Sequence, residues 1–99
     1  MIPGLTSKVS EEDIALATTI SPKTDVVHVT DTTSTTVLTT IRPPYAGFSG
    51  ILIVINESGD NITTVTTGNI QAARTIPVNM PILFIYSKTN DIWFPGAIS

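Results

Sequence analysis

The stretch Ile51-Leu-Ile-Val-Ile55 decides the fold, together with a later one, Ile82-Leu-Phe-Ile-Tyr86. Short apolar runs that do not alternate with polar residues are typical of β-strands covered on both faces. One face of each strand can cover the core of its own domain. We expect the second face to be covered by the N-terminal segment, by a second sheet or by another copy of the chain. The alternative is a closed single-chain sandwich that covers both faces itself.

The rest of the chain also favours strands. Of the 99 residues, 17 are Thr, 14 are Ile and 8 are Val, and these β-branched side chains pack well on a pleated surface. From residue 25 onward, such runs alternate with turn residues about every ten positions, the spacing typical of a sandwich or barrel. We therefore predict an all-β fold, a small antiparallel β-sandwich or barrel of the jelly-roll type, over residues 23–99. The remaining runs are 25–30, 35–42, 61–67, 75–79 and 91–94.

Turn residues and prolines predict how the runs are connected. Residues 58–60 (Ser-Gly-Asp) should close a hairpin, and residues 88–91 (Lys-Thr-Asn-Asp) should close another near the C-terminus. The run 61–67 has its two apolar side chains on opposite faces among threonines, so we expect it near a sheet edge. The stretch 75–82 contains two prolines, which cannot donate to a ladder, and is expected to be an edge strand or a loop.

Residues 1–22 differ from the rest and are predicted to form an arm that precedes the compact domain. Ser10 followed by three acidic residues is typical of a helix start. One interpretation is therefore a short helix. The other is a turn at 10–13 and a strand over about 15–20, and the sequence leaves both open.

Composition and charge argue against several classes of function. The net charge is −3, only 13% of the residues are charged, and the five basic residues are scattered singly, which argues against a nucleic-acid partner. The chain has no cysteine, which excludes disulfides and Cys-ligated zinc. It has no signal-peptide pattern at its start, and its apolar runs are too short to span a bilayer. We expect a soluble protein made in the cytoplasm, with no membrane partner.

The search for catalytic chemistry yields no candidate residue. His28 is the single histidine and is expected to be structural. Residues 47–50 (Gly-Phe-Ser-Gly) lack the spacing of a nucleophile elbow. The oxygen-rich turn around Glu57 and Asp60 lacks the alternating ligands of a calcium loop. We therefore expect no enzyme, no cofactor and no metal site.

The loop 43–50 (Pro-Pro-Tyr-Ala-Gly-Phe-Ser-Gly) is the most informative loop. Its prolines and glycines favour a rigid, tightly turned backbone, and its two aromatic residues either anchor a partner or cap the end of the core. Trp93-Phe94 invites the same two interpretations, with core packing favoured. We predict partner contacts from this loop and from the apolar residues of the N-terminal segment: Ile2, Leu5, Val9, Ile14, Leu16, Tyr45 and Phe48.

The order of these elements resembles a known family. Asp25-Val-Val-His-Val-Thr30, a Thr/Ile run at 35–41 and the loop and strand 43–55 are followed by Thr67-Gly-Asn-Ile70, Tyr86 and Trp93. This order is similar to a β-rich domain of small virion proteins of tailed bacteriophages, found in capsid decoration proteins and at the ends of fibres. The resemblance covers residues 25–95, and Asp31 stands where the pattern usually has Gly. It implies a virion surface role and trimeric assembly, and it implies no enzyme.

The sequence thus predicts a capsid decoration (cement) protein that binds the major capsid protein and stabilises the phage head. It would be made in the host cytoplasm, assemble as a homo-oligomer, with a trimer expected, and reside on the capsid surface. The arm 1–22 would lie on the major capsid protein or clasp a neighbouring subunit. The alternative function is the receptor- or glycan-binding head of a fibre, with Tyr45, Phe48 and Trp93 as a stacking platform.

Overall fold

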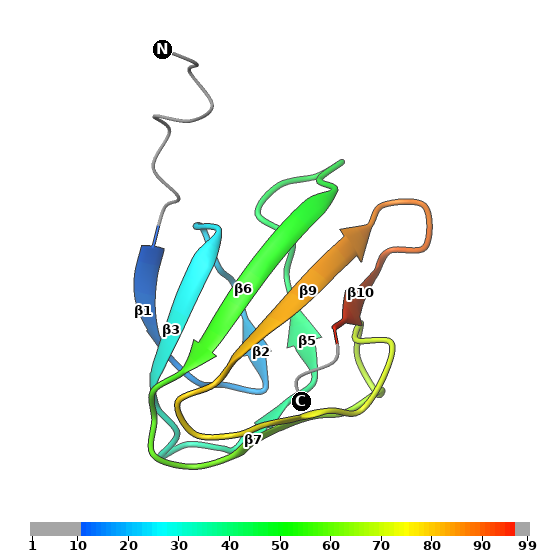
Figure 1. Cartoon of the computed structure of the whole chain (residues 1–99). Coiled ribbons are helices and arrows are strands. Elements are labelled where there is room, and N and C mark those ends of the chain that lie inside the picture. The colour runs from blue at the N-terminus through cyan, green and yellow to red at the C-terminus, as the bar shows by residue number, and fades with distance from the viewer. Residues whose placement is uncertain (1–10, 97–99) are drawn as a thin grey trace.

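The computed structural model describes residues 11–96, which form strands and no helix, so the all-β prediction is confirmed (Figure 1). Within these residues there is accordingly no helix long and apolar enough to cross a membrane. The strands are β1 (Glu11–Ala15), β2 (Thr19–Ile20), β3 (Val26–Asp31), β4 (Val37–Leu38), β5 (Thr40–Ile41), β6 (Gly50–Asn56), β7 (Ile62–Thr64), β8 (Thr75–Ile76), β9 (Pro81–Ser87) and β10 (Ile92–Pro95).

The largest sheet has five strands in the order β1-β3-β6-β9-β10. The pairs β1–β3 and β3–β6 are parallel, whereas β6–β9 and β9–β10 are antiparallel. The sheet is therefore mixed. The prediction of an antiparallel sheet is wrong for β1, β3 and β6. The reason is that the chain between β3 and β6 passes through β4 and β5 in other sheets, and such a crossover allows the next strand to run parallel.

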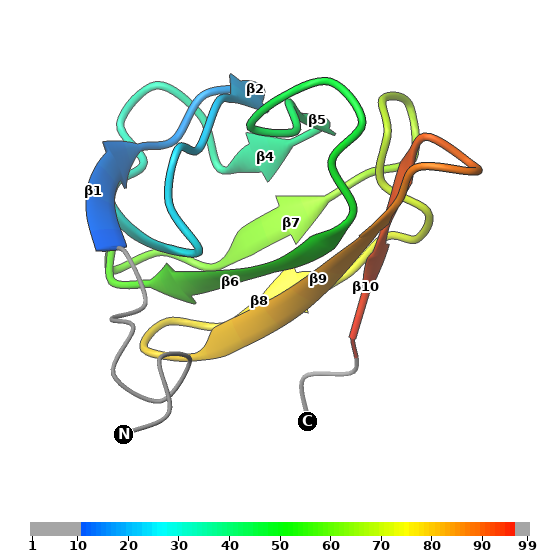
Figure 2. The same cartoon turned by 90° about the horizontal axis from the view of Figure 1, so that it is seen from above.

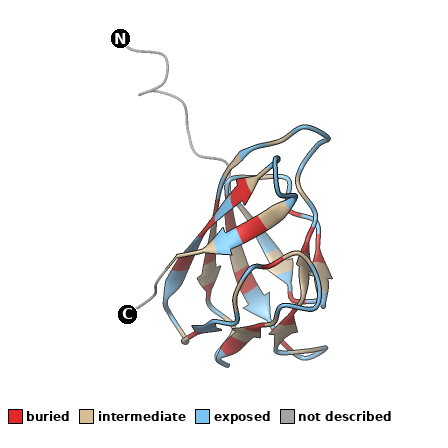
Figure 3. Cartoon of the chain, turned by 90° about the vertical axis from the view of Figure 1, so that its right-hand side faces the viewer, coloured by how far each residue is buried: buried red, intermediate tan, exposed pale blue. Residues whose placement is uncertain are grey.

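Smaller sheets form a second layer against the five-stranded sheet. They are the parallel pair β2–β5 and the three-stranded sheet β4-β7-β8. Figure 2 shows β2, β4 and β5 on one side of β6 and β9. The core lies between the layers, and buried residues alternate with exposed ones along the strands (Figure 3). The core residues are Leu16, Ile20, Val27, Val29, Leu38, Ile41, Leu52, Val54, Ile62, Ile70, Ile76, Ile82, Phe84, Tyr86 and Trp93.

The predicted connections are only partly present. Residues 88–91 join β9 to β10 as a hairpin, with Asp91 in the left-handed region at φ 53°. Residues 58–60 do not close a hairpin, because β6 and β7 belong to different sheets. β7 lies in the middle of its sheet and not at an edge, because Ile62 and Thr64 are both buried and its neighbours flank it on both sides. β8 is an edge strand, as its prolines predicted.

Residues 11–20, which the sequence assigned to an arm, form β1 and β2 and pair with strands of the domain. The helix interpretation of this segment is wrong, and the first strand begins earlier than the strand interpretation placed it. The Glu12 carboxylate explains part of this docking, because it accepts hydrogen bonds from the backbone N–H groups of Lys23 and Thr24 at 2.6 and 3.1 Å. Residues 1–10 lie outside the described residues.

Candidate functional site

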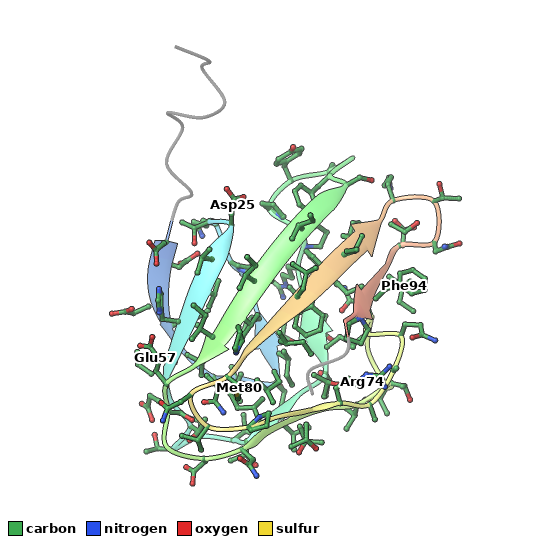
Figure 4. All side chains as sticks on the ribbon, viewed as in Figure 1. Asp25, Glu57, Arg74, Met80 and Phe94 are labelled. Atoms are coloured by element: carbon green, nitrogen blue, oxygen red, sulfur yellow. The ribbon has the colours of Figure 1, made fainter. Side chains whose placement is uncertain are left out.

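The five-stranded sheet carries apolar side chains on the face that points away from the second layer. This surface, called the outer face below, is built by cross-strand neighbours: Ile51 pairs with Ile85, Ile53 with Leu83, and Ile85 also with Phe94. Ile51 is 51% exposed and Ile85 is 49% exposed. Figure 4 shows that the face extends from the side of Glu57 to Phe94 on β10. Its members are Ile51, Ile53, Ile55, Leu83, Ile85 and Phe94.

An exposed apolar surface of this kind is uncommon in soluble monomers and marks contact with a partner. The second layer covers only the inner face of β6 and β9, so the described chain is not a sandwich that covers both faces itself. The side chains of β6 and β9 that point away from the second layer are therefore left exposed in the described chain.

The two edges of the sheet are less suited to association than its face. At the β10 edge, Trp93 donates its backbone N–H to Asn69 and accepts from the N–H of Gln71, so this edge is already paired. At the β1 edge, Glu11 and Asp13 are exposed. Charged side chains on an edge strand oppose pairing with another strand. The face is therefore better suited than the edges to contact with another protein.

His28 links three elements beside the outer face. Its Nδ1 lies 2.7 Å from a carboxylate oxygen of Glu57, and its Nε2 lies 2.6 Å from one of Glu11. These hydrogen bonds to two carboxylates raise the pKa of His28 above its ordinary value of 6.5, because they favour the protonated ring. The two ring nitrogens point in different directions, and no metal-binding group of three acidic, histidine or cysteine side chains occurs in residues 11–96. The geometry is that of a structural clasp.

At the end of the sheet where β6 begins, the loop 43–50 carries an aromatic cluster. Phe48 packs against the core with its ring centroid 6.0 Å from that of Trp93, and Tyr45 meets Phe48 edge-on at 5.5 Å. Tyr45 itself is 64% exposed. The Phe48 ring lies over Gly50, where a Cβ would come within 2.8 Å of it. The two loop aromatics thus differ in role: Phe48 caps the core, whereas Tyr45 is presented to solvent.

A cavity of about 420 Å³ opens beside this cluster. It lies between the loop and the segment that leads into β3, and Figure 4 shows Asp25 at this end of β3. Its wall is mostly apolar and aromatic, with a few polar side chains on one side, as is usual for small-ligand sites. The lining residues are Pro22, Lys23, Thr24, Asp25, Pro44, Tyr45, Phe48, Ile51, Leu52 and Trp93.

The structure distributes the predicted partner-binding residues over different places. Tyr45 and Phe48 line the cavity. Leu16 is 2% exposed in the core of its own chain, so its side chain is not available to a partner, whereas Ile14 is partly buried against that core. The remaining three residues lie outside the described residues: Ile2, Leu5 and Val9.

Sequence reasoning did not name the outer-face side chains individually, although the non-alternating runs were the signal for them. It also missed Lys23 and Asp25, and nothing in their local sequence indicates a site. They line the cavity only because β3 pairs with β6.

No protein-family model matches this chain, and no curated protein or solved structure matches it either. Its function is therefore inferred from the geometry of residues 11–96 and from the resemblance seen in the sequence.

Proposed function

We propose that the protein is a structural component of a phage virion, a capsid decoration (cement) protein that assembles with copies of itself and stabilises the head. The observation that supports this role is the outer face. Four large apolar side chains on neighbouring strands are 38 to 51% exposed, and both edges of the same sheet are blocked or charged. An exposed apolar sheet face is suited to packing against another protein surface.

The partner assigned to the outer face is a second copy of the chain. Two sheets that pack face to face bury their side chains in a layer about 10 Å thick, as in the core of a sandwich. Closed cyclic symmetry is the usual outcome for identical subunits. The trimer implied by the sequence resemblance would place three outer faces around one axis, where each covers part of its neighbours.

The contact with the major capsid protein is assigned to the residues before β1, which include Ile2, Leu5 and Val9. A trimer carries three such segments, so weak individual contacts combine through multivalency. This division leaves the outer face to self-assembly and the N-terminal residues to attachment.

The self-assembly proposal is tested by sedimentation of the purified full chain. The wild type is expected to sediment as a trimer, and Ile85→Asp as a monomer with an unchanged circular dichroism spectrum, because it places a charge in the apolar interface. The matched control is Thr66→Asp, which adds the same charge at an exposed position outside this face and should remain trimeric. A wild type that is monomeric at every concentration would contradict the proposal.

Attachment is tested on purified particles of the phage that encodes the protein. The wild type should be present in a fixed copy number, and a variant lacking residues 1–10 should remain trimeric but be lost from the particles. The deletion stops before Glu11 because β1 pairs with β3. Unchanged occupancy of the shortened protein on the particles would contradict the proposal that these residues attach it.

A further inference from the structure

We propose that the cavity beside Tyr45 is a binding site for a saccharide. This inference goes beyond self-assembly and attachment, because it adds a ligand, in a cavity that borders the outer face at Ile51. The cavity lies at the end of the sheet where β3 and β6 begin, and its volume of about 420 Å³ falls within the range of small-ligand sites, roughly 300 to 1,000 Å³.

The aromatic wall provides a flat apolar surface for a ring. Tyr45 packs perpendicular to Phe48 and is 64% exposed, so its ring stands at the rim. Trp93 lies deeper and donates its indole N–H to the carbonyl of Ile41 at 2.8 Å. Because this bond uses the polar atom of the indole, Trp93 contributes only its apolar ring to the cavity.

The opposite side of the cavity carries polar side chains. The ion pairs found within residues 11–96 involve other side chains, so the Asp25 carboxylate and the Lys23 ammonium, whose charge also acts on the Glu12 carboxylate, line the cavity without a salt bridge to any of residues 11–96. Thr24, between them, is held in place by a hydrogen bond from its hydroxyl to Glu12 at 3.0 Å. One donor and one acceptor thus stand on a segment that Glu12 holds at its centre.

The backbone of β6 adds a second polar element. Ile53 donates its N–H to the carbonyl of Asp25, which lies on the β3 side. Alternate residues of a strand direct their backbone groups to the same side. The N–H and C=O of Ile51 therefore point toward the cavity, where the β3 ladder has ended.

These features together fit a neutral ring that carries hydroxyl groups. The C–H face of such a ring packs on Tyr45 and Phe48, while its hydroxyls bond to Asp25, Lys23 and the backbone. A lone anion would meet the Asp25 carboxylate, and a lone cation would meet the Lys23 ammonium, so the paired charges disfavour both. A saccharide supplies an apolar face and neutral hydrogen-bonding groups in one molecule.

The test uses the full chain and neutral mono- and disaccharides of glucose, galactose, mannose and N-acetylglucosamine. Trp93 is the only tryptophan, so its fluorescence reports directly on the cavity. We expect saturable binding of at least one of these sugars. Tyr45→Ala should weaken it by roughly 10- to 30-fold, Tyr45→Phe should largely retain it, and Asp25→Asn should weaken it through loss of the charged acceptor.

The matched control is Phe94→Ala, which removes an aromatic ring from the outer face but not from the cavity. It should leave sugar affinity unchanged even where it weakens self-assembly, so the failure of one proposal is distinguishable from the failure of the other. Should Tyr45→Ala fail to fold, NMR shifts of the wild type on titration provide the second test. They are expected at Lys23, Asp25 and Tyr45.

Three outcomes would overturn the proposal. The first is absence of a response to every sugar at millimolar concentration. The second is binding that persists in Tyr45→Ala or shifts that map away from the cavity. The third is a response of Trp93 to a proline-rich peptide with none to sugars, which would assign the cavity to a polypeptide.

Discussion

Both faces of β6 and β9 are mainly apolar, but their surroundings are opposite. On the inner face, Leu52 and Phe84 are at most 2% exposed, whereas Ile51 and Ile85 on the outer face remain about half exposed. Each strand alternates between these environments at every residue. The difference teaches that non-alternating apolar strands in a small domain do not have to mean a closed core. One face serves the fold, and the other is available for assembly.

The energetic consequence is that the two faces stabilise different species. Full burial of a large apolar side chain contributes about 1.5 to 3 kcal/mol, and the isolated chain gains this only on the inner face. Outer-face side chains gain it only when a partner covers them. Substitutions on the inner face should therefore affect unfolding of the single chain, and substitutions on the outer face should affect association.

The largest expected effect comes from Phe→Ala substitutions placed on each face. Phe84 is fully buried and packs edge-on against Trp93, so Phe84→Ala should lower the free energy of unfolding by about 3 to 5 kcal/mol. Phe94→Ala on the neighbouring strand should cost the dissociated chain less than about 1 kcal/mol. Urea unfolding of dilute protein measures both. Equal losses would abolish the distinction between the faces.

The next effect concerns the one polar side chain on the inner face of β6. The Asn56 amide donates to the carbonyls of Asp60 and Ile76, and its oxygen accepts from the backbone N–H and hydroxyl of Ser58. Asn56→Ala leaves the buried Ile76 carbonyl without this partner and should cost about 2 to 3 kcal/mol in urea unfolding. The matched control is Asn61→Ala, which removes one exposed bond to Val78 and should cost less than about 1 kcal/mol.

Asn56 also shows where prediction from the sequence ended. Local patterns were sufficient for the all-β class, for the apolar runs and for the turn at 88–91, because these depend on side chains a few residues apart. The turn at 58–60 has the composition of a hairpin but does not close one. Asn56 anchors it to the carbonyl of Ile76, twenty residues away, and no local pattern contains that partner.

Of the two candidate sites, the sequence indicated the outer face but not the cavity. The outer face was foreseeable, because two runs lacking polar alternation require cover on a second side. The cavity was not, because its polar and aromatic sides come from separate loops. Asp25 and Tyr45 are twenty residues apart and line the same cavity only through the parallel pairing of β3 with β6, for which the sequence carries no signal.

A smaller effect separates assembly from folding by means of concentration. If the outer face is buried between copies, unfolding is linked to dissociation, and the Tm of the wild type should rise with protein concentration. The Tm of Leu83→Asp should be lower and independent of concentration, because its subunits unfold alone. Differential scanning calorimetry over roughly a hundredfold range of protein concentration measures this. A concentration-independent Tm in the wild type would contradict burial of this face.

The smallest expected effect is the pH dependence contributed by the His28 clasp. The pKa of His28 is raised in the folded chain by hydrogen bonds to Glu11 and Glu57, so the folded state binds the proton more tightly than the unfolded state does. This stabilisation is complete below the unfolded value of 6.5 and is lost as the pH rises through the higher folded pKa. The free energy of unfolding should therefore fall modestly as the pH rises above 6.5.

The size is limited because the carboxylates of Glu11 and Glu57 are 58% and 43% exposed, where solvent screens the charges. Asp13, the register neighbour of His28 on β1, adds a further negative charge nearby. Glu12 does not interfere, because hydrogen bonding to the backbone of Lys23 lowers its pKa and moves its titration away from this range. His28→Gln retains a polar side chain but cannot titrate, so its unfolding free energy should lose this slope. A slope that persists unchanged in His28→Gln would assign the pH dependence to another group and leave the clasp a purely geometric link between β1, β3 and the end of β6.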